Sequence, residues 1–260
     1  MKKILITFSG HTYENTTKLI VDNGVKFGAD EVKVYDDKWM MEQDFFKLPS
    51  NQWLLNHPHK RGFYWYVWKP FIIWHALSKL EDGDMVIFTD ADCYPIANFS
   101  ALYDICKKDG GVMLFAAEGE RQVQWCKRDC YITMAQDNEG VREVQAGVAR
   151  FMVFQKGSWM ATQFLMEWMT YCVNPLSNTF DPSVLGPELP GFREHRAEQA
   201  IMSNLSYKYK LNLYREACSF GNGVDRNQDL YPQLFVQSNS NGGGKTAEVK
   251  GSSFFNIEKR

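Results

Sequence analysis

The sequence predicts an α/β fold in which helices flank a mostly parallel, Rossmann-like central sheet. The chain opens with an apolar strand at 3–8, a helix to about residue 27 and a second strand at 32–35, which together form a β-α-β unit. The apolar and β-branched run at 85–89 is typical of a strand buried on both faces. With 260 residues, 45% of them hydrophobic, the chain can bury one large core, so we expect a single domain.

The first helix is predicted from its caps and its apolar spacing. Thr12 or Asn15 can accept hydrogen bonds from the free N–H groups at its start. We expect Leu19, Ile20 and Val25 to form its buried side.

A second helix is predicted at about 69–80, because Pro70 suits a first helical turn. Ile73, Leu77 and Leu80 would share its buried face. The segment before it, at 43–59, is expected to be irregular or partly helical. Later patterns predict a strand at 112–116, helices at 157–171 and 192–207, and a long loop rich in Pro and Gly at 174–191.

Two carboxylates follow the predicted strand at 85–89. Asp90 and Asp92 would stand at its carboxyl end, where open α/β sheets bind ligands, and would point the same way if the chain stays extended. Their oxygens suit Mn²⁺ or Mg²⁺, which fills its remaining positions with water and substrate phosphate oxygens. The alternative is a structural role, because Asp at a strand end often stabilises a turn. We favour a metal-nucleotide site.

Other residues at this edge are candidates for contact with a nucleotide. Thr7, Phe8 and Ser9 end the first strand, and Asp36 follows the second, so each could reach a base or ribose. A solvated loop is the alternative for both segments.

Trp68 and Lys69 are further candidates, just before the helix that leads into the two aspartates. The cation could meet a diphosphate and the indole could stack on a sugar or base. The alternative for these aromatic residues is the core.

Acidic side chains supply the candidates for catalysis. Glu198 shares a face of the helix at 192–207 with Ile201, which is the face such a helix should bury. A buried carboxylate is costly unless it pairs with Arg193, Arg196 or another cation, or serves chemistry. The alternative is a partly solvated glutamate stabilised by the helix dipole.

Glu118 and Glu120 follow the strand at 112–116, at what would again be the ligand edge, and either could act as a base. His195 is expected at the surface or in a loop rather than as a ligand.

Composition excludes several classes of partner. The 29 basic and 31 acidic residues give no electrostatic reason to expect nucleic acid. No apolar run approaches the roughly 18 residues of a membrane span. Six scattered cysteines without a secretory signal are typical of free thiols, so the cytoplasm is the expected compartment.

Two segments resemble nucleotide-sugar-dependent glycosyltransferases of the GT-A fold, especially bacterial surface-polysaccharide enzymes. They are Arg61-Gly-Phe-Tyr-Trp-Tyr-Val-Trp-Lys-Pro70 and Asp82-Gly-Asp-Met-Val-Ile-Phe-Thr-Asp-Ala-Asp-Cys93. The segment at 144–154 resembles the strand that lines the acceptor side in such enzymes, and the segment at 195–203 resembles their Asp-Gln helix. The resemblance implies a donor half at about 1–115 and an acceptor half at about 116–217.

The resemblance also implies an activity and residue roles. The enzyme would move a sugar from a nucleotide diphosphate sugar, with UDP as the expected nucleotide, to a glycan or lipid-linked acceptor. Asp90 would contact the ribose or the metal, and Asp92 would bind the metal directly. Glu198 and Gln199 stand where retaining enzymes carry Asp-Gln, which gives retention a slight preference; an inverting enzyme would use Glu118, Glu120 or Glu198 as base. A lipid-linked acceptor would bring peripheral contact with a membrane.

Two alternative functions stay open. A haloacid-dehalogenase-like phosphatase also carries Asp-x-Asp after a strand, although normally near the N-terminus and followed by Gly and Thr. A non-catalytic sugar-binding or scaffold protein could present the same aromatic cleft.

Residues 218–260 are predicted to form a partly flexible C-terminal extension, because the apolar pattern fades beyond Cys218. The stretch Gly-Gly-Gly-Lys245-Thr246 lacks the spacing of a phosphate-binding loop. One hypothesis is that this extension closes over the donor, with Lys245 neutralising the diphosphate; a mobile tail is the alternative.

Overall fold

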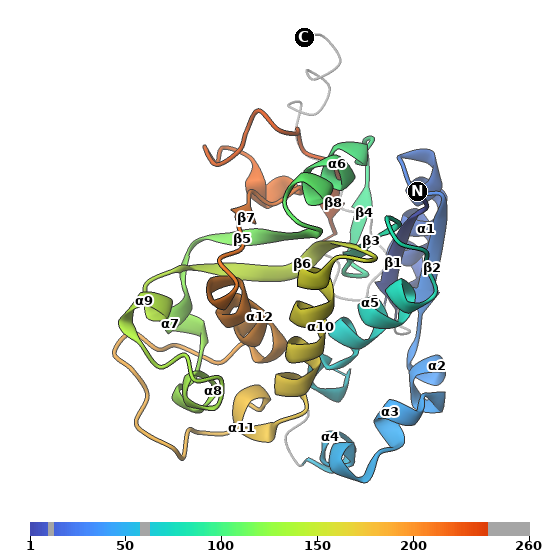
Figure 1. Ribbon diagram of the computed structural model, residues 1–260. Helices are drawn as coiled ribbons and strands as arrows, with labels where there is room; N and C mark the ends of the chain where they lie inside the picture. The colour runs from blue at the N-terminus through green and yellow to red at the C-terminus, as the bar shows by residue number, and fades with distance from the viewer. Residues whose placement is uncertain (10–12, 58–62, 239–260) are drawn as a thin grey trace.

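The computed structural model describes residues 1–9, 13–57 and 63–238, which fold around a six-stranded sheet with the order β2-β1-β3-β6-β5-β7 (Figure 1). The described strands are β1 (Lys3–Phe8), β2 (Glu31–Tyr35), β3 (Met85–Thr89), β4 (Cys93–Pro95), β5 (Val112–Arg121), β6 (Gln145–Gln155), β7 (Leu213–Tyr214) and β8 (Phe235–Gln237). Strand β6 runs antiparallel to β3 and β5, and the other neighbouring pairs of this sheet are parallel. The predicted mostly parallel α/β architecture is therefore confirmed.

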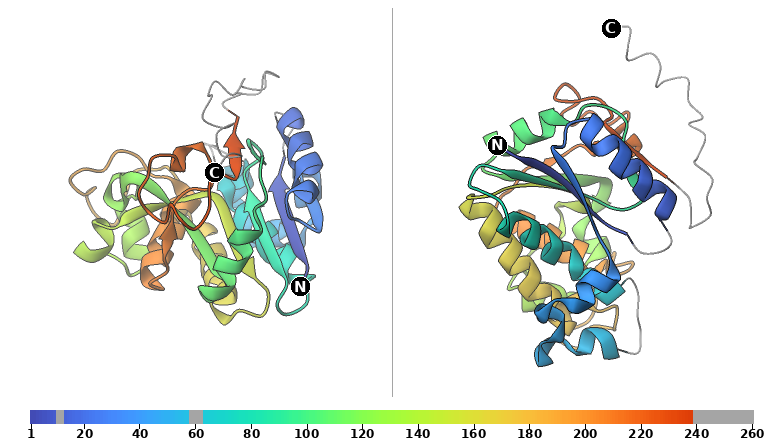
Figure 2. Two further views of the ribbon diagram at one scale, coloured as in Figure 1. Left: turned by 90° about the horizontal axis from the view of Figure 1, so that it is seen from above. Right: turned by 90° about the vertical axis from the view of Figure 1, so that its right-hand side faces the viewer.

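The helices lie on both faces of this sheet. They are α1 (Glu14–Lys26), α2 (Asp37–Glu42), α3 (Asp44–Lys47), η1 (Pro49–Asn51), α4 (Trp53–Asn56), η2 (Phe63–Tyr66), α5 (Trp68–Ser78), α6 (Ser100–Lys108), α7 (Gln122–Trp125), α8 (Arg128–Thr133), α9 (Glu139–Arg142), α10 (Trp159–Cys172), α11 (Pro175–Asn178), α12 (Ala197–Lys208) and η3 (Ser219–Gly221). Figure 2 shows α1 and α6 on one face and α5 and α10 on the other.

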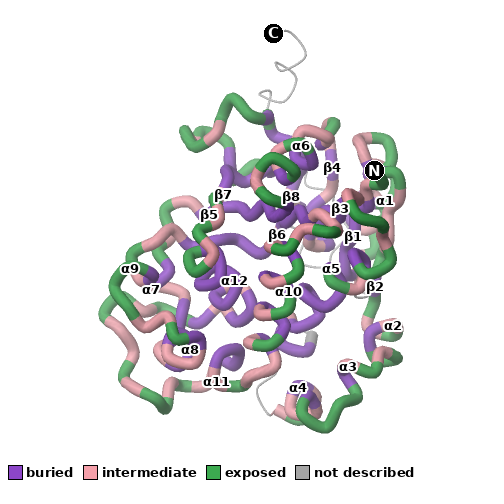
Figure 3. The backbone as a smooth tube through the Cα atoms, viewed as in Figure 1, coloured by how far each residue is buried: buried purple, intermediate pink, exposed green. Residues whose placement is uncertain are grey.

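Strand β3 is the centre of the fold, and all five of its residues are buried. Val86 and Phe88 face the cluster that includes side chains of α5, α10 and α12, whereas Met85 and Ile87 face the cluster that includes side chains of α1 and α6. Successive side chains of a strand point to opposite faces, so a strand covered on both sides needs an unbroken apolar run. Figure 3 shows this burial along the sheet.

Helix α1 packs on the sheet through part of the predicted face, since Leu19 is half-buried and Ile20 is buried. Ile20 is fully buried as expected, but Val25 is 56% exposed and Gly24 is buried in its place. A Cβ atom on Gly24 would lie 2.4 Å from a methyl group of Val32 and 2.9 Å from one of Leu5. The absence of a side chain therefore lets the helix approach the strands closely, a contact that apolar spacing does not reveal.

The helix predicted at 192–207 begins five residues later, at Ala197. The backbone N–H groups of Arg193 and Arg196 donate to the carbonyls of Gln124 (2.9 Å) and Trp125 (3.0 Å). These bonds to α7 hold residues 193–196 outside the helix, because the same donors cannot also serve a helical turn.

Strand β5 is longer than predicted, so Glu118 and Glu120 lie within it and not after it. Its far end pairs with β6 across an irregular stretch, in which Gln145 Nε2 donates to the Glu120 carbonyl at 3.0 Å.

The described part of the C-terminal segment packs with the domain. Tyr231, Leu234 and Phe235 belong to the same buried cluster as β3 side chains, and β8 pairs with β4 in a separate two-stranded sheet. Within the described ranges, no helix has the combined length and apolar character that crossing a bilayer requires.

Candidate active site

Asp90 and Asp92 lie at the carboxyl end of β3, but the chain turns between them. The Cys93 N–H donates to the Asp90 carbonyl at 3.0 Å, and the Asp90 N–H donates to the Arg150 carbonyl of β6 at 3.0 Å. Because the chain does not stay extended, the two carboxylates meet different partners: Asp90 faces Lys69, and Asp92 faces Gln237.

Lys69 stands between two acidic side chains from distant parts of the sequence. Its Nζ lies 3.1 Å from a carboxylate oxygen of Asp90 and 3.1 Å from one of Glu198, and it donates to the Ala149 carbonyl at 3.2 Å. The Lys69 side chain is 7% exposed and that of Glu198 is 6% exposed. The three N–H donors of the ammonium group thus each have a protein acceptor. The cation that the buried Glu198 requires is Lys69, and not Arg193 or Arg196.

Burial and charge act against each other in this cluster. Burial raises the pKa of Glu198 to about 7, although the neighbouring Lys69 ammonium opposes that shift. Burial also raises the pKa of Asp90. Burial alone would lower the pKa of Lys69, but the Asp90 and Glu198 carboxylates raise it above its ordinary value. Lys69 therefore stays charged, and Glu198 titrates near neutral pH.

Arg150 and Glu216 form an ion pair beside Asp90 that the sequence did not reveal. Arg150 Nη1 lies 2.7 Å from a carboxylate oxygen of Glu216, and their side chains are 20% and 8% exposed. The positive charge of Arg150 lowers the pKa of Asp90, against the effect of burial. The strand at 144–154 was predicted, yet a single arginine on it gave no pattern to single it out.

A cavity of about 320 Å³ opens beside this cluster. The predicted residues Lys69, Asp90, Glu198 and Gln199 line it, together with Tyr66, Phe180, Glu194, His195 and Arg196. A larger hollow of about 590 Å³ lies near the end of α12 and includes none of the predicted site residues. The smaller cavity is the candidate active site because it borders the buried charges.

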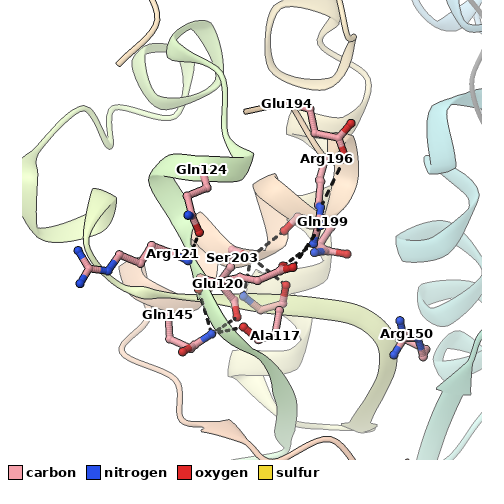
Figure 4. A network of polar contacts seen from close by, with 12 residues as sticks. Ala117, Glu120, Arg121, Gln124, Gln145, Arg150, Glu194, Arg196, Gln199 and Ser203 are labelled. Carbon is pink, nitrogen blue, oxygen red and sulfur yellow. Dashed lines mark hydrogen bonds and ion pairs between the residues drawn. The ribbon is translucent and has the colours of Figure 1, made fainter. Parts of the chain in front are cut away.

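Figure 4 shows the polar network on one side of the cavity. Arg196 donates to the Glu120 carboxylate at 2.5 and 3.3 Å and lies 3.5 Å from the ring centroid of Trp125. Glu118 is separate from this network: it accepts from Arg226 at 2.7 Å and does not line the cavity. Among the three glutamates considered as bases, only Glu198 lines the cavity.

The remaining predicted residues mostly have structural contacts. Phe8 and Trp68 stack on each other with ring centroids 4.2 Å apart, and Thr7 is fully buried in β1. The carboxylate of Asp36 accepts from the Trp39 N–H at 2.7 Å and so caps α2. Ser9 contacts the hydroxyl of Thr17 at 2.7 Å. Lys245 lies outside the described residues.

His195 lies in the loop before α12, as one of the two expectations held, but it is not at the surface, because it is only 3% exposed. Its Nδ1 accepts from the Lys127 N–H at 3.2 Å, and its Nε2 lies 2.8 Å from the Ser177 carbonyl. Burial, together with the charge of Lys127, lowers the pKa of His195 to about 3. A neutral imidazole thus joins the residues before α12 to α11.

Residues with a left-handed backbone conformation lie shortly before Lys69 and immediately before Glu198 in the chain. Tyr64, Trp65 and Tyr66, just before Lys69, have φ values of 47°, 54° and 59°. Ala197, just before Glu198, has a φ of 41°. The left-handed conformation costs about 1–2 kcal/mol for a residue with a Cβ atom, so the surrounding packing must impose it. Trp65, for example, is 1% exposed.

Substituting glycine for two alanines with positive φ tests whether the left-handed backbone at these positions is strained. Ala135→Gly, at an exposed position with a φ of 52°, is expected to raise the free energy of unfolding by about 1 kcal/mol. Ala197→Gly relieves the same strain but removes a buried methyl group worth about 0.8 kcal/mol, so its stability should change little. Urea denaturation measures both. A loss above about 2 kcal/mol in Ala197→Gly would show that its backbone is unstrained.

Comparisons with known proteins give matches among solved structures alone: no family model and no curated protein sequence matches the chain. The apo structure of mouse xyloside xylosyltransferase 1 is 9% identical, with 93% of this chain and 98% of that chain covered and a TM-score of 0.46. The apo structure of the bifunctional glycosyltransferase WbbM is 11% identical, with 92% of this chain and 46% of that chain covered and a TM-score of 0.54.

The likeness to WbbM concerns the fold. This chain spans less than half the length of WbbM, and the two share 11% of aligned residues. The chain thus has an α/β fold, with a mostly parallel sheet flanked by helices, that also occurs in a solved glycosyltransferase structure.

Proposed function

We propose that this protein is a metal-dependent glycosyltransferase that moves a sugar from a nucleotide diphosphate sugar, with UDP as the nucleotide, to a glycan or lipid-linked acceptor. The observation that carries the proposal is the Asp90–Lys69–Glu198 cluster, in which Lys69 and Glu198 are buried, beside a cavity at the carboxyl end of β3. Ligands of open α/β sheets bind at this edge. The fold shared with WbbM also supports glycosyl transfer as the activity.

The residues present fit a hard divalent cation. One carboxylate oxygen of Asp92 is buried and has no hydrogen-bond partner in the described part of the chain. Within the same ranges, no group of three or more His, Cys, Asp and Glu side chains is placed to hold a metal. A site with only two carboxylates suits Mn²⁺ or Mg²⁺, because these ions keep waters and substrate phosphate oxygens as their other ligands. Asp90 and Asp92 would hold the ion, which when bound would neutralise charge on the leaving diphosphate.

The chain's own groups supply the remaining chemistry. The Glu198 carboxylate borders the cavity, where it can stabilise positive charge on the sugar as the glycosidic bond breaks. Lys69 holds this carboxylate and that of Asp90 in place. The Gln199 side chain also lines the cavity, and its amide can bind sugar hydroxyls. Because Glu198 is already ion-paired with Lys69, we favour the retaining outcome, in which an oxygen of the leaving diphosphate takes the acceptor proton.

A donor panel tests this function. The protein is incubated with UDP- and GDP-sugars, with Mn²⁺ or with a chelator, and the release of nucleoside diphosphate is measured. We expect metal-dependent release of UDP, and a product whose anomeric configuration, read by NMR, matches that of the donor. Release of phosphate from a generic phosphomonoester, or donor binding without turnover, would contradict the proposal.

The pKa of Glu198 predicts a pH dependence. Only its ionised form stabilises positive charge on the sugar, so kcat/KM should rise with pH through an inflection near pH 7. Glu198→Gln should lower kcat/KM and remove this inflection, because the amide does not titrate. The pH profiles of the two proteins measure this. An inflection near pH 7 that persists in Glu198→Gln would assign the titration to another group.

A further inference from the structure

The short strand β8 brings Gln237 to the Asp92 carboxylate. In the antiparallel pairing of β4 with β8, Gln237 lies opposite Cys93, the residue that follows Asp92. The N–H of Ser238 donates to the Asp92 carbonyl at 2.7 Å. Main-chain contacts on both sides therefore set the position of Gln237 at the end of the Asp-x-Asp segment.

The side chains of Gln237 and Asp92 share one hydrogen bond and leave two oxygens without partners. Gln237 Nε2 donates to one Asp92 carboxylate oxygen at 2.8 Å. The other Asp92 oxygen and the Gln237 amide oxygen are both buried, with no hydrogen-bond partner in the described ranges. A buried unsatisfied oxygen costs about 1–3 kcal/mol, so each of these two oxygens would be stabilised by an electropositive partner.

We propose that Gln237 is a ligand of the divalent cation, through its amide oxygen. The inference rests on the proposed function, which places the cation at Asp90 and Asp92. Side-chain amide oxygens are hard, neutral ligands that join carboxylates around such ions. The amide carries both an oxygen and an NH₂ group, so it can donate to Asp92 as it does here, and rotation about its last bond would turn its oxygen to a cation.

The neighbouring groups favour an oxygen site over a sulfur site. Cys93, which follows Asp92 in the chain, and Cys218 are both buried. Cys218 Sγ donates to the Glu216 carboxylate at 3.2 Å, so this thiol already has a protein partner. The oxygens of Asp90, Asp92 and Gln237 are hard donors, a set that suits Mn²⁺ or Mg²⁺ rather than a thiophilic metal.

The test measures Mn²⁺ affinity directly, by electron paramagnetic resonance of free Mn²⁺ at saturating UDP. We expect Gln237→Leu to weaken Mn²⁺ binding about 10- to 100-fold. Gln237→Glu keeps an oxygen ligand and adds charge, so it should bind Mn²⁺ at least as tightly as the wild type. Gln228→Leu, an exposed glutamine of the same segment, is the matched control and should behave as the wild type.

The outcomes separate this inference from the function on which it rests. Equal Mn²⁺ affinity in Gln237→Leu and the wild type would overturn the role of Gln237 and leave the metal-nucleotide site standing. Weaker binding in Gln237→Glu than in the wild type would also overturn it, and this variant decides the question if Gln237→Leu fails to fold. If the wild-type protein binds no Mn²⁺ in the presence of UDP, the proposed function itself is contradicted.

Discussion

Replacing Lys69 with methionine is expected to lower the free energy of unfolding by about 3–5 kcal/mol, the cost of breaking a buried ion pair by removing one partner. Lys69 is the cation between Asp90 and Glu198, each 3.1 Å from its Nζ. Methionine fills a similar volume, so the loss comes from carboxylates left without a counter-charge and not from a cavity. Urea denaturation at pH 8, where Glu198 is ionised, measures the effect.

Two further variants identify the cause of that loss. Lys79→Met removes an exposed lysine at the end of α5 and should change stability by less than about 0.5 kcal/mol. Lys69→Met combined with Glu198→Gln leaves one fewer buried charge and should recover part of the loss. A change below about 1 kcal/mol in Lys69→Met would contradict the buried cluster.

Asp92→Asn is expected to slow sugar transfer about 10²- to 10³-fold, the size of effect seen when one group that stabilises transition-state charge is removed. The substitution keeps the shape of the side chain and an oxygen that can accept from Gln237 Nε2. Stability should therefore change by less than about 1 kcal/mol while kcat falls. Steady-state kinetics with Mn²⁺ and the UDP-sugar that the donor panel identifies measure the rate.

The matched control is Asp104→Asn, at an exposed position on α6. It removes the same charge from the protein and should leave kcat unchanged. If Asp92→Asn keeps the full rate, the metal role of Asp92 is wrong. Asp92 then only stabilises the turn after β3, which is the structural alternative.

The sheet could be predicted because its strands carry strong local patterns. The run at 85–89 is apolar except for Thr89, and the structure buries it on both faces with the predicted bounds. The contact of Gly24 with β2 and the hydrogen bonds of residues 193–196 with α7 could not be predicted. Both depend on partners distant in the sequence, which override the local preference for a helix face or a helix start.

The site could be predicted in its residue types but not in its pairings. The inward face of α12 indicated that Glu198 needs a cation, yet Lys69 is 129 positions away, and only the fold brings the two together. Gln237 had no pattern of its own, because β8 has three residues and its position depends on the pairing with β4. Short strands carry too few residues for alternation to mark them.

The most direct test of the central claim is calorimetric titration of the protein with UDP, with and without Mn²⁺, repeated on Asp92→Asn. It requires no knowledge of the acceptor or the donor sugar. The proposed site predicts UDP binding that depends on Mn²⁺ in the wild type and that is lost or strongly weakened in Asp92→Asn. UDP binding of equal strength without Mn²⁺ and in Asp92→Asn, or no binding at all, would contradict a metal-nucleotide site at the end of β3.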